Sequence, residues 1–120
     1  ELSNVSMRAL AALEREPGLR IGELAAREGI RQPSMSQAMK RLVNDGYAAR
    51  HTADDDARAT ALTITDAGRE VLRSYRAAAA EALAPVFEPL KPEDVATLKR
   101  AAELLPELTA ELKQRTGGRA

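Results

Sequence analysis

The stretch that decides the fold is Ile21-Gly-Glu-Leu-Ala-Ala-Arg-Glu-Gly29, continued through Ile30-Arg-Gln32 into Pro33-Ser-Met-Ser-Gln-Ala-Met-Lys-Arg-Leu-Val-Asn-Asp-Gly46. In its first half, Ile21, Leu24 and Ala25 recur at the spacing of one helical face, so we expect them to point inward. Gly29 follows the last of these apolar positions and predicts a helix end, because glycine adopts a positive φ at little cost. The first half therefore reads as one short helix with a sharp stop.

The second half reads as another helix, with one apolar face and one polar face. Pro33 suits its first turn, where no backbone donor is needed, and Gly46 closes it. The apolar positions are Met35, Ala38, Met39 and Leu42, widened by Val43. The polar face carries Ser34, Gln37, Lys40 and Arg41, flanked by Gln32 and Ser36. Since hydroxyls and amides reach base edges and cations reach phosphates, the two helices predict a helix-turn-helix that places its second helix in the DNA major groove.

A β-hairpin is expected directly after the second helix. Its strands should be Tyr47–His51 and Ala59–Ile64, with Ala53–Arg58 between them, and Leu19-Arg20 should form a short strand that pairs with the hairpin. A polar helix face alone is typical of any solvated helix. Here a hairpin with a cationic residue at its tip directly follows that helix in the chain, and the combination favours nucleic-acid binding.

Further helices should flank this region. Ser3 suits the N-cap of a first helix that Pro17-Gly18 ends. Thr65 or Asp66 should cap a long helix from Ala67 to about Phe87. The expected buried positions of the first helix are Met7, Leu10, Ala11 and Leu13.

The last predicted helix begins at Pro92, after a break at residues 88–91. Pro85 should bend or interrupt the preceding helix, and Pro106 should kink this one. Its apolar stripe consists of Val95, Leu98, Ala102, Leu105, Leu108 and Leu112. Such a stripe most often packs within its own domain, but two helices alone cannot bury both of their faces, so a second chain is the alternative.

Several of these segments resemble the MarR family, which comprises bacterial and archaeal winged-helix transcription regulators. The matching segments are Leu24-Ala25, Ile30-Arg-Gln-Pro-Ser-Met-Ser-Gln37, Leu42-Val-Asn-Asp-Gly-Tyr47, Asp56-Ala-Arg58 and Leu62-Thr-Ile-Thr-Asp-Ala-Gly68-Arg69. The hairpin followed by a Leu-Thr-x-x-Gly-Arg pattern is the most specific of them, and the resemblance covers the chain from Leu2 onward. At Ala53 and Asp54 the sequence departs from the family's usual Asp-Pro.

The resemblance implies a mostly α fold with a small β-hairpin wing. A winged helix-turn-helix region would occupy residues 2–64, C-terminal dimerisation helices residues 65–115, and a flexible tail residues 116–120. The residues implied to contact a second copy of the chain are Leu98, Leu105, Leu108 and Leu112. The N-terminal helix that precedes this region in the family is absent from this sequence, so dimerisation by this chain stays open.

The resemblance also implies a function and its residues. The resemblance implies that the DNA bases are contacted by Gln32, Pro33, Ser34, Ser36 and Gln37. Lys40 and Arg41 would mostly contact phosphates, and Arg58 would enter the minor groove while Asp56 supports the wing. A two-fold homodimer would place two recognition helices in successive major grooves over a pseudo-palindromic operator. The implied protein is a transcriptional regulator, expected to be a repressor. In many family members a small aromatic ligand releases the DNA, but this sequence identifies none.

Composition and charge limit the other classes. The absence of Cys excludes a disulfide framework and a thiolate metal site. The 18 basic and 18 acidic residues balance, yet cations exceed acids between residues 18 and 51 and acids exceed cations between residues 92 and 113. We therefore expect the first of these regions to face DNA. No membrane-spanning run or secretory signal is visible, which predicts a cytoplasmic protein.

The sequence gives little support to other classes of site. No nucleophile, phosphate-loop or metal-ligand motif is present, so we expect neither an enzyme nor a cofactor. Asp54-Asp55-Asp56 lacks the spacing and glycine of a calcium loop and predicts surface charge, and His51 is expected to make a structural or DNA-backbone contact. A winged helix that docks proteins is the remaining alternative. The features that favour DNA over it are Ser34, Gln37, Lys40, Arg41 and Arg58.

Overall fold

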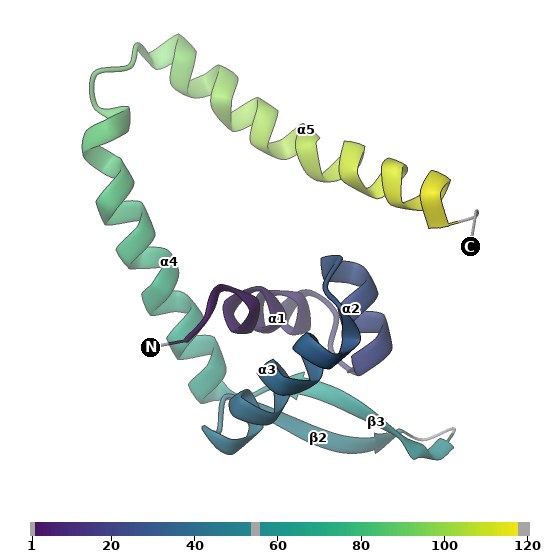
Figure 1. The fold of residues 1–120 in the computed structure, drawn as a ribbon. Helices are drawn as coiled ribbons and strands as arrows, with labels where there is room; N and C mark the ends of the chain where they lie inside the picture. The colour runs from purple at the N-terminus through teal and green to yellow at the C-terminus, as the bar shows by residue number, and fades with distance from the viewer. Residues whose placement is uncertain (1, 54–55, 118–120) are drawn as a thin grey trace. The chain divides into compact units, whose positions relative to one another are not determined.

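The computed structural model describes residues 2–53 and 56–117, with side chains for residues 2–52 and 60–116. Its helices are α1 (Asn4–Arg15), α2 (Ile21–Glu28), α3 (Gln32–Asn44), α4 (Asp66–Phe87) and α5 (Pro92–Gly117), and its strands are β1 (Leu19–Arg20), β2 (Ala48–Ala53) and β3 (Asp56–Ile64). Figure 1 shows this mostly helical fold with its small sheet. The predicted fold class, a winged helix-turn-helix followed by two helices, is confirmed.

The described residues form a small antiparallel sheet in the order β1-β3-β2. Leu19 pairs with Leu62, so the predicted short strand is confirmed. The hairpin is longer than predicted, because the pairing continues past a register irregularity to Ala53 and Asp56. Asp56 to Arg58 therefore belong to β3 and not to the tip, since backbone pairing outweighs the charged composition there. Asp54 and Asp55 lie outside the described residues.

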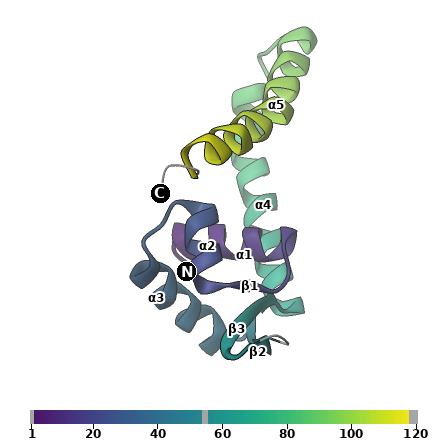
Figure 2. The same ribbon diagram turned by 90° about the vertical axis from the view of Figure 1, so that its right-hand side faces the viewer.

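The core lies where α1, α2 and α3 pack on one another and against the hairpin (Figures 1 and 2). Its largest completely buried apolar side chains are Leu10, Leu13, Leu24, Met35, Met39, Leu42 and Leu62. Several positions predicted to point inward are only partly buried, because they lie at the edges of their helical faces: Met7, Ala11, Ile21 and Val43. The helical periodicity thus identified the centre of the core better than its margin.

The helix ends follow from local chemistry. The Ser3 hydroxyl accepts a hydrogen bond from the Ser6 backbone N–H at 3.1 Å, as an N-cap should. Gly29 and Gly46 have φ values of 63° and 80°, so both predicted helix stops use the left-handed backbone that favours glycine. Arg20 lacks an oxygen to cap α2, and the Glu23 carboxylate instead accepts from the Arg20 backbone N–H at 3.1 Å.

The chain forms two compact units, Glu1–Ala78 and Ala79–Ala120. Their boundary falls inside α4, later than the predicted boundary after residue 64, because Gly68 and Leu72 are buried with the first unit. α4 continues through Pro85 to Phe87 without the expected interruption, since the proline stands in the last turn, where few later residues depend on it.

α5 likewise continues on both sides of Pro106 and reaches Gly117. Thr116, the first residue of the predicted flexible tail, lies within this helix, and its hydroxyl donates to Leu112 O at 3.0 Å. Residues 118–120 lie outside the described residues.

A first prediction concerns Gly68. A Cβ at this position would lie 2.1 Å from Tyr47 O and 2.8 Å from Ile64 Cγ1. We expect Gly68→Ala to lower the free energy of unfolding by about 1–3 kcal/mol, because backbone and side chain must move apart. Gly22→Ala is the matched control, since its Cβ would meet only Gln32 Oε1, at 3.7 Å; the gain in helix propensity should then raise stability by up to about 1 kcal/mol. Urea unfolding of the two variants measures the contrast, and equal effects would contradict the close approach.

Candidate nucleic-acid interface

α3 presents one buried face and one exposed face. Met35, Ala38, Met39 and Leu42 are buried, as predicted. On the other side, the exposed residues are Gln32, Pro33, Ser34, Gln37, Lys40 and Arg41, while Ser36 is half-buried. The structure therefore gathers all the predicted recognition-helix residues on the accessible side of one helix.

The turn between α2 and α3 is fixed by backbone hydrogen bonds. Ile30 N–H donates to Ala25 O at 3.0 Å, which ends α2, and Met35 N–H donates to Arg31 O at 3.0 Å, which begins α3. The buried side chains of both helices then set the angle between them. This turn and the two helices match the arrangement in which DNA-binding proteins hold a recognition helix.

Ion pairs fasten α1 to α2 behind the recognition helix. The Glu28 carboxylate accepts from Arg8 at 3.2 Å and from Arg15 at 3.4 Å, and Arg8 also donates to Glu28 O. Arg27 pairs with Glu16 at 3.2 Å. The hydrogen bond to Glu16, then its negative charge, raises the pKa of the Arg27 guanidinium above its ordinary value. Arginine is fully charged at physiological pH in any case, so this pair gives no pH switch.

Apart from Arg20, the described cations of the first unit fall into two groups. Those paired with carboxylates are Arg8, Arg15, Arg27, Arg41, Arg69, Arg73 and Arg76. Among the described residues, Arg31, Lys40 and Arg50 make no ion pair or hydrogen bond through their side chains. Arg31 precedes α3, Lys40 lies on α3 and Arg50 on β2. The unneutralised positive charge thus belongs to the recognition helix and the neighbouring wing strand.

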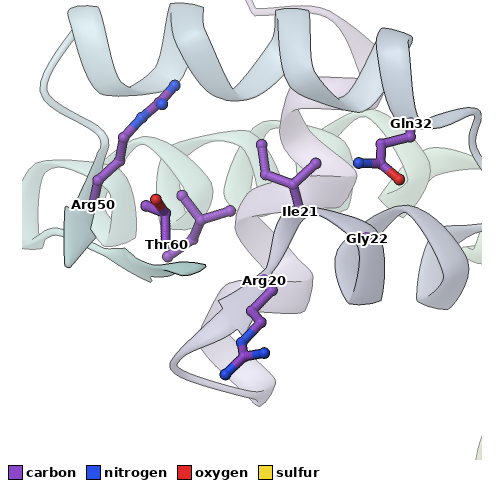
Figure 3. A pocket seen from close by; sticks show the side chains of 7 residues that line it. Arg20, Ile21, Gly22, Gln32, Arg50 and Thr60 are labelled. Carbon is purple, nitrogen blue, oxygen red and sulfur yellow. The ribbon is translucent and has the colours of Figure 1, made fainter. Parts of the chain in front are cut away.

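A surface pocket of about 290 Å³ lies between the start of α2, the start of α3 and the wing. Its lining residues are Arg20, Ile21, Gly22, Gln32, Arg50, Thr60 and Leu62. In Figure 3 Arg50 points from β2 toward α3, whereas Arg20 points away from it. Ile21 and Leu62 supply apolar surface, and Gln32 and Arg50 supply polar groups on either side.

Arg50 was not among the predicted site residues. It was visible in the sequence only as one of several cations. A strand's alternation places it on the same side as Ala48, which is buried and lies two residues earlier. That alternation was the signal that could have directed Arg50 toward α3.

The wing is described in part. By their backbones Asp56 and Arg58 lie in β3, but their side chains are outside the described residues, so the predicted minor-groove contact stays a prediction. His51 Nε2 lies 2.8 Å from Thr63 Oγ1 on the neighbouring strand, which is a structural contact of the kind expected for this histidine.

The four leucines predicted for dimerisation lie on α5 in the second unit. Leu98, Leu105, Leu108 and Leu112 are 47%, 59%, 66% and 61% exposed. The second unit by itself therefore leaves each of these leucines largely uncovered.

Metal ligands and membrane-spanning helices are the other features of interest. Within residues 2–53 and 56–117 no three His, Cys, Asp or Glu side chains are grouped so that they could hold a metal ion. None of the helices in the described part of the chain has the length and hydropathy of a membrane-spanning segment.

Comparison with known proteins gives consistent matches. A sequence model of the MarR family matches residues 2–59. An uncharacterized HTH-type transcriptional regulator of Mycobacterium leprae is 31% identical over 103 residues, which cover 86% of this chain and 72% of that protein. The HTH-type transcriptional regulator TcaR of Staphylococcus aureus is 25% identical over 107 residues, covering 88% and 70%.

Solved structures show the same fold. A crystal structure of MarR matches with a TM-score of 0.83 at 18% identity, covering 95% of this chain and 78% of that one. Streptococcus pneumoniae FabT, in a crystal structure in complex with DNA, matches with a TM-score of 0.70 at 16% identity, covering 93% and 78%.

Proposed function

The chain belongs to the MarR family of transcriptional regulators, and on this premise we propose that it binds a pseudo-palindromic operator in double-stranded DNA as a homodimer and represses transcription by occupying that site. The observation that carries the DNA-binding part is the position of the unpaired cations. Arg31, Lys40 and Arg50 lie on α3 or next to it, whereas the arginines of α1, α2 and α4 are paired with carboxylates.

The exposed face of α3 offers the chemistry that reads bases. Gln37 carries an amide that can both donate to and accept from an adenine edge, and Ser34 and Ser36 carry hydroxyls that suit either kind of partner. Lys40, Arg41 and Arg50 are suited to phosphates, and Arg58 to the minor groove. Gln32 and Pro33 complete the set at the start of the helix, where the positive end of the helix dipole also attracts phosphate.

A homodimer accounts for the exposed leucines of α5. Large apolar side chains left in water are unfavourable by about 25 cal/mol per Å² relative to burial. An exposed stripe of this kind on a helix marks an interface. A two-fold partner would cover Leu98, Leu105, Leu108 and Leu112 with the same side chains of the second copy.

Support for the DNA complex comes also from FabT, a structural neighbour crystallised with DNA. Operator occupancy itself needs no small ligand.

Selection of bound sequences from a randomised duplex pool at near-physiological salt tests the proposal. We expect recovery of an inverted repeat whose half-site centres lie about one helical turn apart. A lone half-site would mean that DNA reading is correct and the dimer is not. No enrichment would contradict DNA binding and favour a protein-docking role. Transcription in vitro from a promoter placed over the recovered site then separates repression from activation.

The wing assignment makes a second prediction for DNA binding. Arg58→Ala should weaken binding to the recovered site and reduce the slope of log affinity against log salt by about one, because one cationic contact is lost. Lys99→Ala removes a cation from exposed α5 and serves as the matched control, with no change expected. If Arg58→Ala leaves both affinity and salt slope unchanged, the wing does not contact DNA.

The dimer can be tested separately. We expect the double substitution Leu105→Glu and Leu112→Glu to weaken self-association by at least about tenfold, because burying a carboxylate in an apolar interface is unfavourable. Gln114→Glu adds negative charge on the opposite side of the same helix, at about 100° per residue, and should leave the dimer intact. Sedimentation velocity gives the oligomeric state. A double variant that sediments like the unsubstituted chain would place the interface elsewhere.

A further inference from the structure

We propose that Thr65 is a positioning residue that sets the spacing between the two half-sites read by the protein, because it ties the end of the recognition helix α3 to the first turn of α4. The inference rests on the proposed function, since only a dimeric DNA reader has a half-site spacing. Thr65 stands between β3 and α4 and is half-buried.

The hydroxyl of Thr65 makes hydrogen bonds in two directions. It donates to Gly46 O at 2.6 Å and accepts from the Gly68 backbone N–H at 3.1 Å. The Thr65 backbone N–H donates to Tyr47 O at 3.1 Å. Gly46 and Tyr47 directly follow α3, whereas Gly68 lies in the first turn of α4. One residue therefore joins the end of one helix to the beginning of another.

The joint leaves little room for movement. Gly68 is buried so close to Tyr47 O that a Cβ would lie 2.1 Å from it. On the other side, Tyr47 N–H donates to Leu42 O at 2.8 Å, which bonds the same peptide segment back to α3. α3, the Gly46-Tyr47 segment and the start of α4 are thus held by direct contacts without an intervening loop.

Two other contacts of α4 with the first unit constrain its direction less. Arg76 and Glu14 pair at 2.9 Å, but their side chains are 53% and 36% exposed, and exposed ion pairs contribute little. Leu72 is buried, but apolar burial is not directional. Hydrogen bonds require a particular distance and angle, so we assign the direction in which α4 leaves the winged helix to the Thr65 hydrogen bonds together with the close contact of Gly68 with Tyr47 O.

α4 carries that direction onward. The helix is continuous from Asp66 to Phe87 and crosses from the first compact unit into the second. In the proposed dimer the second units of two chains associate. The angle at the first turn of α4 then determines how far apart the two copies of α3 lie, and so which half-site spacing fits.

Three substitutions separate the two roles of the hydroxyl. Thr65→Val keeps the shape and removes both hydrogen bonds. Thr65→Asp keeps an oxygen that accepts from Gly68 N–H, as aspartate does at helix N-caps, but it cannot donate to Gly46 O when ionised. Thr65→Ser keeps both and is the matched control. If Thr65→Val does not fold, Thr65→Asp carries the same test with the helix cap intact.

The first measurement compares binding to a half-site duplex, to the inverted repeat recovered by selection, and to repeats lengthened or shortened by one or two base pairs. Unsubstituted protein and Thr65→Ser should prefer one spacing. Thr65→Asp and Thr65→Val should bind the half-site within about twofold of normal, but the preferred repeat about tenfold more weakly, which is the effect of about one hydrogen bond. Their preference among spacings should flatten.

A normal spacing preference in Thr65→Asp and Thr65→Val would overturn the inference. So would a loss of half-site affinity as large as the loss of full-site affinity, because Thr65 would then serve the winged-helix fold alone. An unsubstituted protein that reads only a lone half-site would also overturn it. If selection with the unsubstituted protein enriches no sequence, the proposed function fails instead. The second measurement then still tests whether the Thr65 hydroxyl holds α4 in a fixed direction relative to α3.

The second measurement needs no DNA. The chain has no Cys, so Lys40→Cys on α3 and Ser74→Cys on α4, both exposed and both in the first unit, can carry spin labels without background. With labelled protein diluted in unlabelled protein, the distance between labels within one chain should be narrowly distributed when Thr65 is retained and in the Thr65→Ser variant. The distribution should broaden in Thr65→Asp and Thr65→Val. Equal widths in all four proteins would overturn the role of the hydroxyl.

Discussion

Burial of Met35, Met39 and Leu42 fixes the direction in which α3 faces, and the candidate interface depends on that direction. Each such side chain contributes about 1.5–3 kcal/mol when fully buried, and all three are completely buried. A rotation of the helix by one residue would expose Met39 and bury Lys40, and burial of an unpaired ammonium group is strongly unfavourable. The polar face is therefore held outward before any partner is present, and binding does not have to reorganise it.

The distribution of carboxylates gives a neutral chain a locally positive surface. Glu14, Glu16 and Glu28 each pair with arginines of α1, α2 or α4, and none of them pairs with a cation of α3. The cations that remain without partners in the described part of the first unit are associated with α3 and the wing. Such local fields steer encounter with an oppositely charged polymer even when the total charge is zero. The same ion pairs fasten the helices that support the recognition helix.

The sequence predicted those features that depend on neighbouring residues. The Ser3 cap and the stops at Gly29 and Gly46 follow from hydrogen bonds and φ values within a few positions, and the stripe on α3 follows from helical periodicity. The extent of the hairpin depends on strand pairing across the sheet, which composition does not encode, whereas the direction of Arg50 follows from a strand alternation that the prediction of site residues left unused. The two-sided contacts of Thr65 also bring together segments that are distant in sequence, so its residue type indicated a helix cap and nothing more.

Arg41 differs from Lys40 in having its own counter-ion. Asp45, one turn later on the same helix segment, lies 3.7 Å from the Arg41 guanidinium, so a phosphate that binds Arg41 must displace a carboxylate. The exchange of one anion for another yields little free energy on an arbitrary duplex, where the helix is poorly seated. In the proposed complex Arg41 would therefore add slightly less affinity for an arbitrary duplex than Lys40, by the small amount that an exposed ion pair contributes.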